Sequence, residues 1–107
     1  MNITNPPVLS TTELSQIAAT FGTPVYVYHA ERIAHQYKQL SEAFEGTKAK
    51  FFYACKALTN INVLRYIRSL GAGLDCVSIN EVQLGLKAGF APGRNTRFLT
   101  RVSANWE

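Results

Sequence analysis

The sequence predicts an α/β fold in which parallel strands alternate with helices. Two segments, residues 50–55 and 74–79, are nearly continuous apolar runs of strand length, as expected for strands covered on both faces. The predicted strands at Phe51, Leu74 and Arg97 are evenly spaced along the chain, with helical periodicity between them, which indicates right-handed βα crossovers. This order fits either a doubly wound sheet or the opening of a (β/α)8 barrel.

A capped helix is predicted near the start of the chain. Residues 1–9 are expected to be extended because two prolines interrupt them. Ser10 and Glu13 form a capping-box pattern, and apolar residues then recur at helical spacing as far as Phe21. Gly22 is predicted to end this helix as a left-handed C-cap.

A short strand and a second helix are predicted next. Residues 23–29, "TPVYVYH", alternate Val and Tyr and favour a strand. A helix is predicted from Ala30, with one apolar face formed by Ile33, Tyr37, Leu40 and Phe44. Gly46 and Thr47 are expected to break it.

The second half of the chain carries the repeating pattern. After the strand at 50–55, Thr59 or Asn60 can cap a third helix, which Gly71 and Gly73 end. Residues 74–79 form the next predicted strand.

A fourth helix and a further strand complete the predicted order. Ser78 and Glu81 repeat the capping-box pattern and start a helix that Gly89 ends. Residues 96–100, "TRFLT", predict a weaker strand. No sequence repeat accompanies the structural one.

Composition and charge exclude several classes of protein. The chain is 47% hydrophobic, carries a net charge of +4, and scatters its basic residues without a cluster, which argues against a nucleic-acid partner. No apolar run approaches the ~20 residues of a membrane span. The N-terminal residues lack the basic flank and apolar block of a signal peptide, so we expect a cytoplasmic protein without a membrane partner.

The cysteines and histidines do not predict a metal site. Cys55 and Cys76 each lie in an apolar run and are expected to be buried, reduced thiols. They lack the spacing and the histidine neighbours of a zinc site. His29 and His35 likewise have no acidic or cysteine partner at metal spacing, so we expect no metal.

Lys56 is the first candidate for chemistry. It follows an apolar strand, at the carboxyl end where α/β folds gather their sites. Burial beside apolar neighbours lowers the pKa of a lysine and favours the neutral amine, the nucleophile that a Schiff base requires. The alternative is that Lys56 is an ordinary solvated lysine where the strand meets its loop.

Asp75 is the second candidate. It lies inside an apolar strand, and parallel neighbours bring it near the same end of the sheet as Lys56. A carboxylate there needs a partner, such as a lysine, a backbone cap or an arginine outside this chain. The alternative is a partly exposed carboxylate at a strand end. Tyr53 and Ser78 are either pocket-lining residues or packing and capping residues.

Three stretches of the chain resemble one enzyme family. They are "GTPVYVYHAERI", "FFYACKALTN" and "LRYIRSLGAGLDCVSINEVQLGLKAGF". Together they resemble diaminopimelate decarboxylase and its pyridoxal-phosphate-dependent relatives with an alanine-racemase-like barrel. The Tyr-Ala-x-Lys-Ala motif, Gly-Ala-Gly-x-Asp and a Val-Ser-x-x-Glu helix start are specific as a set. The resemblance covers about residues 21–90.

The resemblance implies a cofactor and the residues that hold it. Lys56 matches the Schiff-base lysine that carries pyridoxal 5'-phosphate. Asp75 matches an acidic position near the cofactor, and Ala54 matches a small strand residue beside the cofactor ring. All three are therefore expected cofactor-binding residues, with Lys56 also catalytic. Ile79 and Asn80 depart from the family, which usually has glycines there.

The resemblance also implies a reaction and partners. In the full-length family, meso-diaminopimelate, a small amino acid, loses carbon dioxide to give L-lysine, and the enzyme is a homodimer with a shared active site. A decarboxylase of the ornithine or arginine type is the alternative within the same family.

The chain is expected to be an N-terminal fragment of such an enzyme. The match weakens after Pro92, and a complete barrel needs roughly 250 residues. We therefore expect the N-terminal part of a (β/α)8 barrel, incomplete, with about three βα units. Residues 1–22 would form a lead-in segment and helix, and residues 23–107 the partial barrel, inactive alone. A small non-catalytic βαβ interaction module is the alternative from another class of protein.

Overall fold

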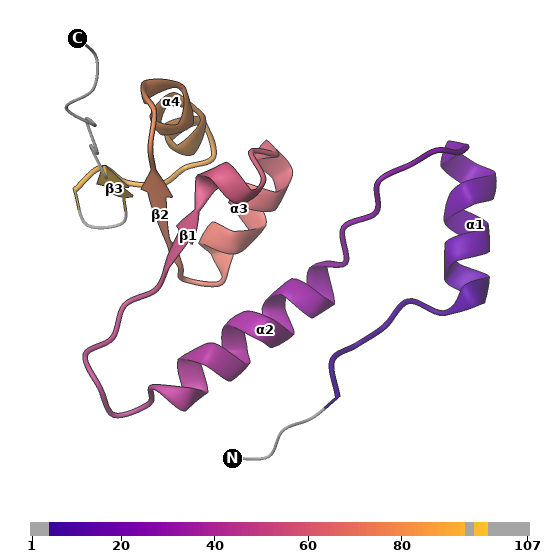
Figure 1. The fold of residues 1–107 in the computed structure, drawn as a ribbon, viewed down its shortest axis with the longest axis horizontal. Helices are drawn as coiled ribbons and strands as arrows, with labels where there is room; N and C mark the ends of the chain where they lie inside the picture. The colour runs from indigo at the N-terminus through magenta and orange to yellow at the C-terminus, as the bar shows by residue number, and fades with distance from the viewer. Residues whose placement is uncertain (1–4, 94–95, 99–107) are drawn as a thin grey trace, which may run out of the picture. The chain divides into compact units, whose positions relative to one another are not determined.

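The computed structural model describes residues 5–93 and 96–98. The chain divides into two compact units, Met1–Glu45 and Gly46–Glu107, which are taken in turn. The first contains two helices, and the second contains a parallel sheet with its helices (Figure 1). This arrangement confirms the predicted α/β class.

Helix α1, Thr11–Phe21, forms where the capping box predicts it. The Ser10 hydroxyl accepts the Glu13 N–H at 3.1 Å, and the Glu13 carboxylate accepts the Ser10 N–H at 2.7 Å. Each residue's side chain thus accepts the backbone N–H of the other, and both N–H groups would otherwise lack an acceptor at the helix start. Gly22 ends the helix with φ 80° and ψ 175°, so φ is positive as expected, but ψ is extended and not left-handed helical.

Helix α2, Ala30–Ala43, also follows its prediction, and the chain leaves it before Gly46 at φ 81°. No helix in the described part of the chain is long and apolar enough to cross a membrane.

The predicted strand at 23–29 is wrong, because these residues form neither helix nor strand. All four of its alternating Val and Tyr side chains, Val25, Tyr26, Val27 and Tyr28, are exposed. A strand exists only where a neighbouring strand satisfies its backbone. No described strand pairs with this segment, and β-propensity without a partner does not suffice.

The second unit is built on three parallel strands. Strands β1, Phe52–Ala54, β2, Gly73–Cys76, and β3, Thr96–Phe98, lie in the order β1-β2-β3. Helix α3, Ile61–Ser69, connects the first two strands, and helix α4, Ile79–Lys87, connects the last two (Figure 1). The described residues thus contain two complete βα units and a third strand, an order compatible with part of a barrel. The end of the predicted third strand, residues 99–100, lies outside the described residues.

Local signals start both helices of this unit. Asn60 caps α3, because its side-chain oxygen accepts the N–H groups of Asn62 and Val63. The Ser78 hydroxyl accepts the Glu81 N–H at 3.2 Å at the start of α4. The Glu81 carboxylate accepts the N–H of Val77, one residue before the expected capping-box partner, at 3.1 Å. The strand therefore ends at Cys76, earlier than predicted, since the chain is already turning into α4.

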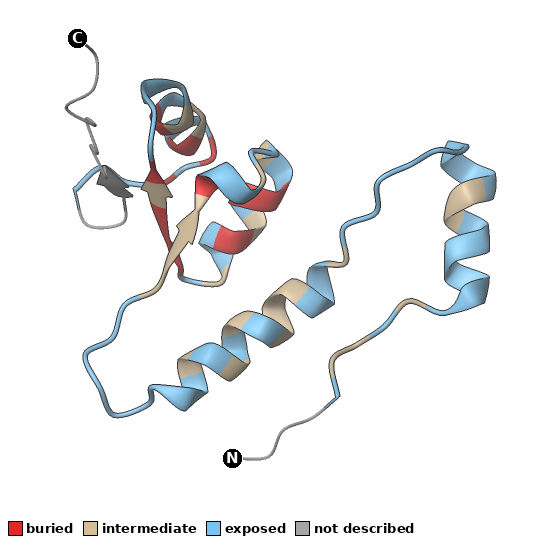
Figure 2. Ribbon diagram, viewed as in Figure 1, coloured by how far each residue is buried: buried red, intermediate tan, exposed pale blue. Residues whose placement is uncertain are grey.

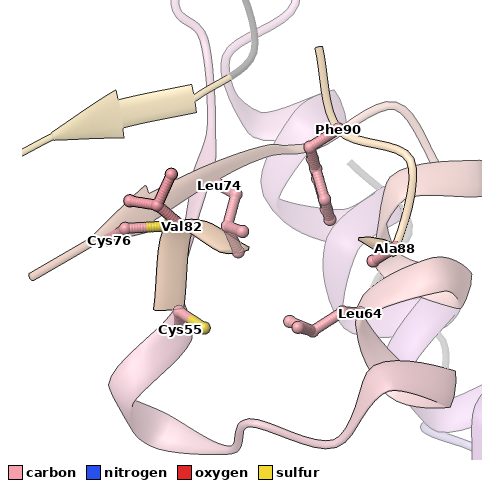
Figure 3. Packing of buried hydrophobic residues seen from close by; sticks show 7 residues of the cluster. All are labelled: Cys55, Leu64, Leu74, Cys76, Val82, Ala88 and Phe90. Carbon is pink, nitrogen blue, oxygen red and sulfur yellow. The ribbon is translucent and has the colours of Figure 1, made fainter. Parts of the chain in front are cut away.

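One hydrophobic core lies between the sheet and its helices. Leu74 and Cys76 point into it from β2, opposite Leu64 of α3 and Val82 of α4 (Figure 3). The buried cluster consists of Cys55, Leu64, Leu74, Cys76, Val82, Ala88 and Phe90. Because side chains alternate along a strand, Asp75 lies on the other face of β2, away from this core.

Candidate functional site

The candidate residues gather at the carboxyl ends of β1 and β2. The Cα atoms of Ala54 and Asp75 are direct partners in the parallel register. In-register neighbours on parallel strands direct their side chains to the same face, so Ala54 lies beside Asp75 on the face opposite the core. Lys56 follows Ala54 by two residues, just past the end of β1. That it lies near Asp75 remains a prediction.

Lys56 lies in a 3₁₀ turn, η1, Cys55–Ala57, that begins where β1 ends. The turn sends Cys55 into the core and leaves the lysine exposed. The expectation that apolar neighbours bury Lys56 is therefore wrong. The apolar run continues the strand pattern in sequence, but the backbone has already left the strand and alternation no longer applies.

Asp75 is half-buried, and one of its carboxylate oxygens, Oδ1, is buried without a hydrogen-bond partner. No ion pair joins Asp75 to Lys56 within the part of the chain that the structure describes. A buried carboxylate oxygen with no donor is costly, so this atom marks a place where a donor group would bind favourably. The partner that we expected for Asp75 from the sequence is not found among the described residues.

The two cysteines lie directly behind the site. Cys55 and Cys76 are free thiols, 0% and 1% exposed, which confirms their predicted burial. Burial raises the pKa of both thiols, that of Cys76 to about 11, and the negative charge of Glu81 adds to the rise in each. The hydrogen bond between the two thiols partly offsets the rise in the pKa of Cys55. Protonated thiols of this kind are poor nucleophiles, so they pack the core behind Lys56 and Asp75.

Tyr53 and Ser78, left undecided by the sequence, have separate roles. Ser78 caps α4. Tyr53 packs against the core cluster, and its hydroxyl donates a hydrogen bond to the Leu58 carbonyl at 3.3 Å. This contact links β1 to the end of the turn that carries Lys56. Sequence reasoning missed it, because no spacing rule predicts a side chain's bond to a loop carbonyl.

The remaining candidates do not form a second site. His29 and Glu31 approach to 3.9 Å near the start of α2. Across residues 5–93 and 96–98, no three histidine, cysteine or acidic side chains gather as metal ligands would. A shallow groove of about 250 Å³ runs along α1 in the first unit. It is lined by Leu9, Glu13, Gln16, Ile17, Thr20 and Phe21.

Comparison with known proteins defines the class to which this site belongs. A family model described as "Pyridoxal-dependent decarboxylase, pyridoxal binding domain" matches residues 30–98, which include the whole candidate site. The chain therefore belongs to the pyridoxal-dependent decarboxylase family.

Its curated relatives include several diaminopimelate decarboxylases. The chain is 44% identical to that of Methanothermobacter thermautotrophicus over 81 residues, which are 74% of this chain and 19% of the relative. It is 42% identical to the Campylobacter jejuni enzyme over 72% of this chain and 19% of the relative. Identity to the Pseudomonas aeruginosa enzyme is also 42%, over 76% of this chain and 20% of the relative. The chain spans about a fifth of the length of these relatives.

Proposed function

We propose that this chain supplies the attachment lysine, Lys56, of a pyridoxal-phosphate-dependent amino-acid decarboxylase. One observation carries the proposal. The turn after β1 presents an exposed lysine, and the neighbouring strand β2 carries Asp75 with a buried, unpartnered carboxylate oxygen, both inside the stretch that matches the pyridoxal-binding domain. A nucleophilic amine open to solvent and a buried acceptor without a donor are both features that such a site would use.

The described residues fit pyridoxal phosphate in three respects. The ε-amine of Lys56 is exposed and free to form a covalent bond to the cofactor's carbonyl carbon. Asp75 Oδ1 offers an acceptor that a donor group at the site would satisfy. Ala54, paired with Asp75, adds only a methyl group to that face of the sheet. These three residues are the proposed cofactor-binding set.

Each residue then has a distinct task. When bound, the cofactor supplies a pyridinium ring that accepts the electrons left behind as carbon dioxide departs. Lys56 would hold the group through Nζ and would provide the amine that releases the product. Asp75 would accept a hydrogen bond from a donor group bound at the site and so orient it. Because Asp75 is half-buried, this electrostatic interaction is stronger than the same interaction in water.

For the whole protein we propose decarboxylation of meso-diaminopimelate to L-lysine. The names of the relatives support this substrate, and a homodimer with a shared site is predicted with it. Carbon dioxide release from diaminopimelate, ornithine and arginine by the whole protein tests the choice. Release from ornithine or arginine alone would overturn the proposed substrate and leave the attachment lysine standing.

The fold and domain predictions belong to the same proposal. We assign β1, α3, β2, α4 and β3 to a (β/α)8 barrel, with residues 23–107 inside that domain and residues 1–22 as its lead-in. Helices α3 and α4 cover one sheet face, and the candidate site occupies the carboxyl ends of the strands, as in such barrels.

The attachment lysine is tested by chemical trapping. The protein is incubated with pyridoxal phosphate, reduced with borohydride and digested, and the labelled peptides are mapped by mass spectrometry. We expect label to concentrate at Lys56, and Lys56→Gln to abolish that concentration. Lys50→Gln, at an exposed lysine just before β1, is the matched control and should leave it unchanged. Label spread evenly over the lysines would contradict the proposal.

A further inference from the structure

The turn that carries Lys56 is held at both ends. At its start, Cys55 is fully buried in the core cluster. At its end, the Leu58 N–H donates back to the Cys55 carbonyl at 3.2 Å. The lysine therefore projects from a short closed turn whose backbone is tied to the core, although its own side chain is exposed.

Tyr53 adds the second tie at Leu58. Its hydroxyl donates to the Leu58 carbonyl at 3.3 Å, so both backbone groups of Leu58 are engaged. The tyrosine is a rigid support for this bond, because it belongs to β1, pairs with Leu74 of β2 and packs against the core cluster. An aromatic side chain has few rotatable bonds, so little freedom is lost in holding the hydroxyl there.

We infer that Tyr53 is a positioning residue for Lys56, holding closed the turn from which the lysine reaches the site. The inference rests on the proposed role of Lys56 and deepens it. Tyr53 acts through its hydrogen bond to Leu58, at the end of the turn. Without the hydroxyl, the far end of the turn would keep only the Leu58 N–H bond, and the lysine would sample more directions. Correct placement of a reacting group is a large part of such chemistry.

Hydrogen exchange tests the tie without any cofactor. In Tyr53→Phe, which removes only the hydroxyl, protection of the Leu58 amide should fall about two- to tenfold, the range that one hydrogen bond's net stabilisation produces. Protection in β2 should not change. Tyr66→Phe on α3 removes a hydroxyl from another half-buried tyrosine of the same unit and should leave Leu58 unchanged. Unchanged Leu58 protection in Tyr53→Phe would overturn the inference, as would an equal loss across the whole unit.

Borohydride trapping then separates this inference from the proposed function. If the parent protein concentrates label at Lys56 and Tyr53→Phe spreads it to other lysines, with Tyr66→Phe like the parent, the positioning role is supported. If Tyr53→Phe labels Lys56 as selectively and as fast as the parent over the whole pH range, the positioning role is overturned and the attachment lysine stands. If the parent itself shows no selectivity for Lys56, the proposed function fails, and the positioning role for Lys56 falls with it, whatever exchange shows at Leu58.

Discussion

The two units of this chain contain helices of the same design with opposite outcomes. Helices α1 and α2 carry apolar faces at helical spacing, yet none of their residues is buried (Figure 2). Helices α3 and α4 are shorter, yet they bury Val63, Leu64, Ile67, Val82 and Gly85. Amphipathic sequence is common to both units, and side-chain caps start α1 as well as α3 and α4. What differs is the sheet, which gives α3 and α4 an apolar face to cover.

The comparison separates what makes a helix from what makes a core. Capping and hydrophobic periodicity act within a few residues, so helices form in both units. Burial needs a second surface, which the second unit provides through Leu74 and Cys76 on β2. The candidate site belongs to the unit with the core, because a reactive side chain needs a backbone held in place beneath it.

The largest expected difference in stability is between truncating a leucine in the second unit and truncating one in the first. Leu74→Ala should lower the free energy of unfolding by about 2–5 kcal/mol, because Leu74 is 0% exposed at the centre of the core. Leu14→Ala in α1, where the leucine is 47% exposed, should change it by about 0.5 kcal/mol or less. Urea unfolding of the two variants measures the difference. Equal losses would mean that the first unit contributes a core of its own.

Alkaline pH should weaken the second unit selectively. Burial raises the pKa of Cys76 from 9.0 to about 11, so between these values the folded state keeps a proton that the unfolded state has released. The stabilisation is complete below pH 9.0 and is lost as pH rises to about 11, by on the order of 1–3 kcal/mol. Urea unfolding at neutral pH and near pH 11 should show a smaller drop in Cys76→Ala than in the parent. The same drop in both would assign the loss to other groups.

Removing a helix cap should have the smallest effect and a different signature in each unit. Ser78→Ala should lower the free energy of the cooperative unfolding transition by about 1 kcal/mol, because α4 packs on the core. Ser10→Ala should cost α1 a similar amount locally and reduce helical circular dichroism without moving that transition. A shift of the main transition by Ser10→Ala as large as that by Ser78→Ala would show that both units unfold together.

Most of the elements were predictable from the sequence because their causes are local. The side chains of Ser10, Asn60 and Ser78 cap helices where their spacing predicts it. The parallel order of the strands was also predictable, since even spacing of buried strands leaves few alternatives. The strand predicted at 23–29 failed because pairing is not local: its alternating residues favour a strand but cannot supply its partner.

By itself, the sequence determined the α/β class and most helix starts, singled out Lys56 and Asp75 as candidates, and carried the resemblance to a pyridoxal-dependent family. Only the tertiary structure decided that Lys56 is exposed, that Asp75 Oδ1 has no partner among the described residues, and that Tyr53 ties down the turn. The physical reason is the distance along the chain over which each cause acts. Caps and periodicity act within one or two turns of a helix, whereas exposure and hydrogen-bond satisfaction depend on surfaces that meet only when β1, β2 and their helices pack together.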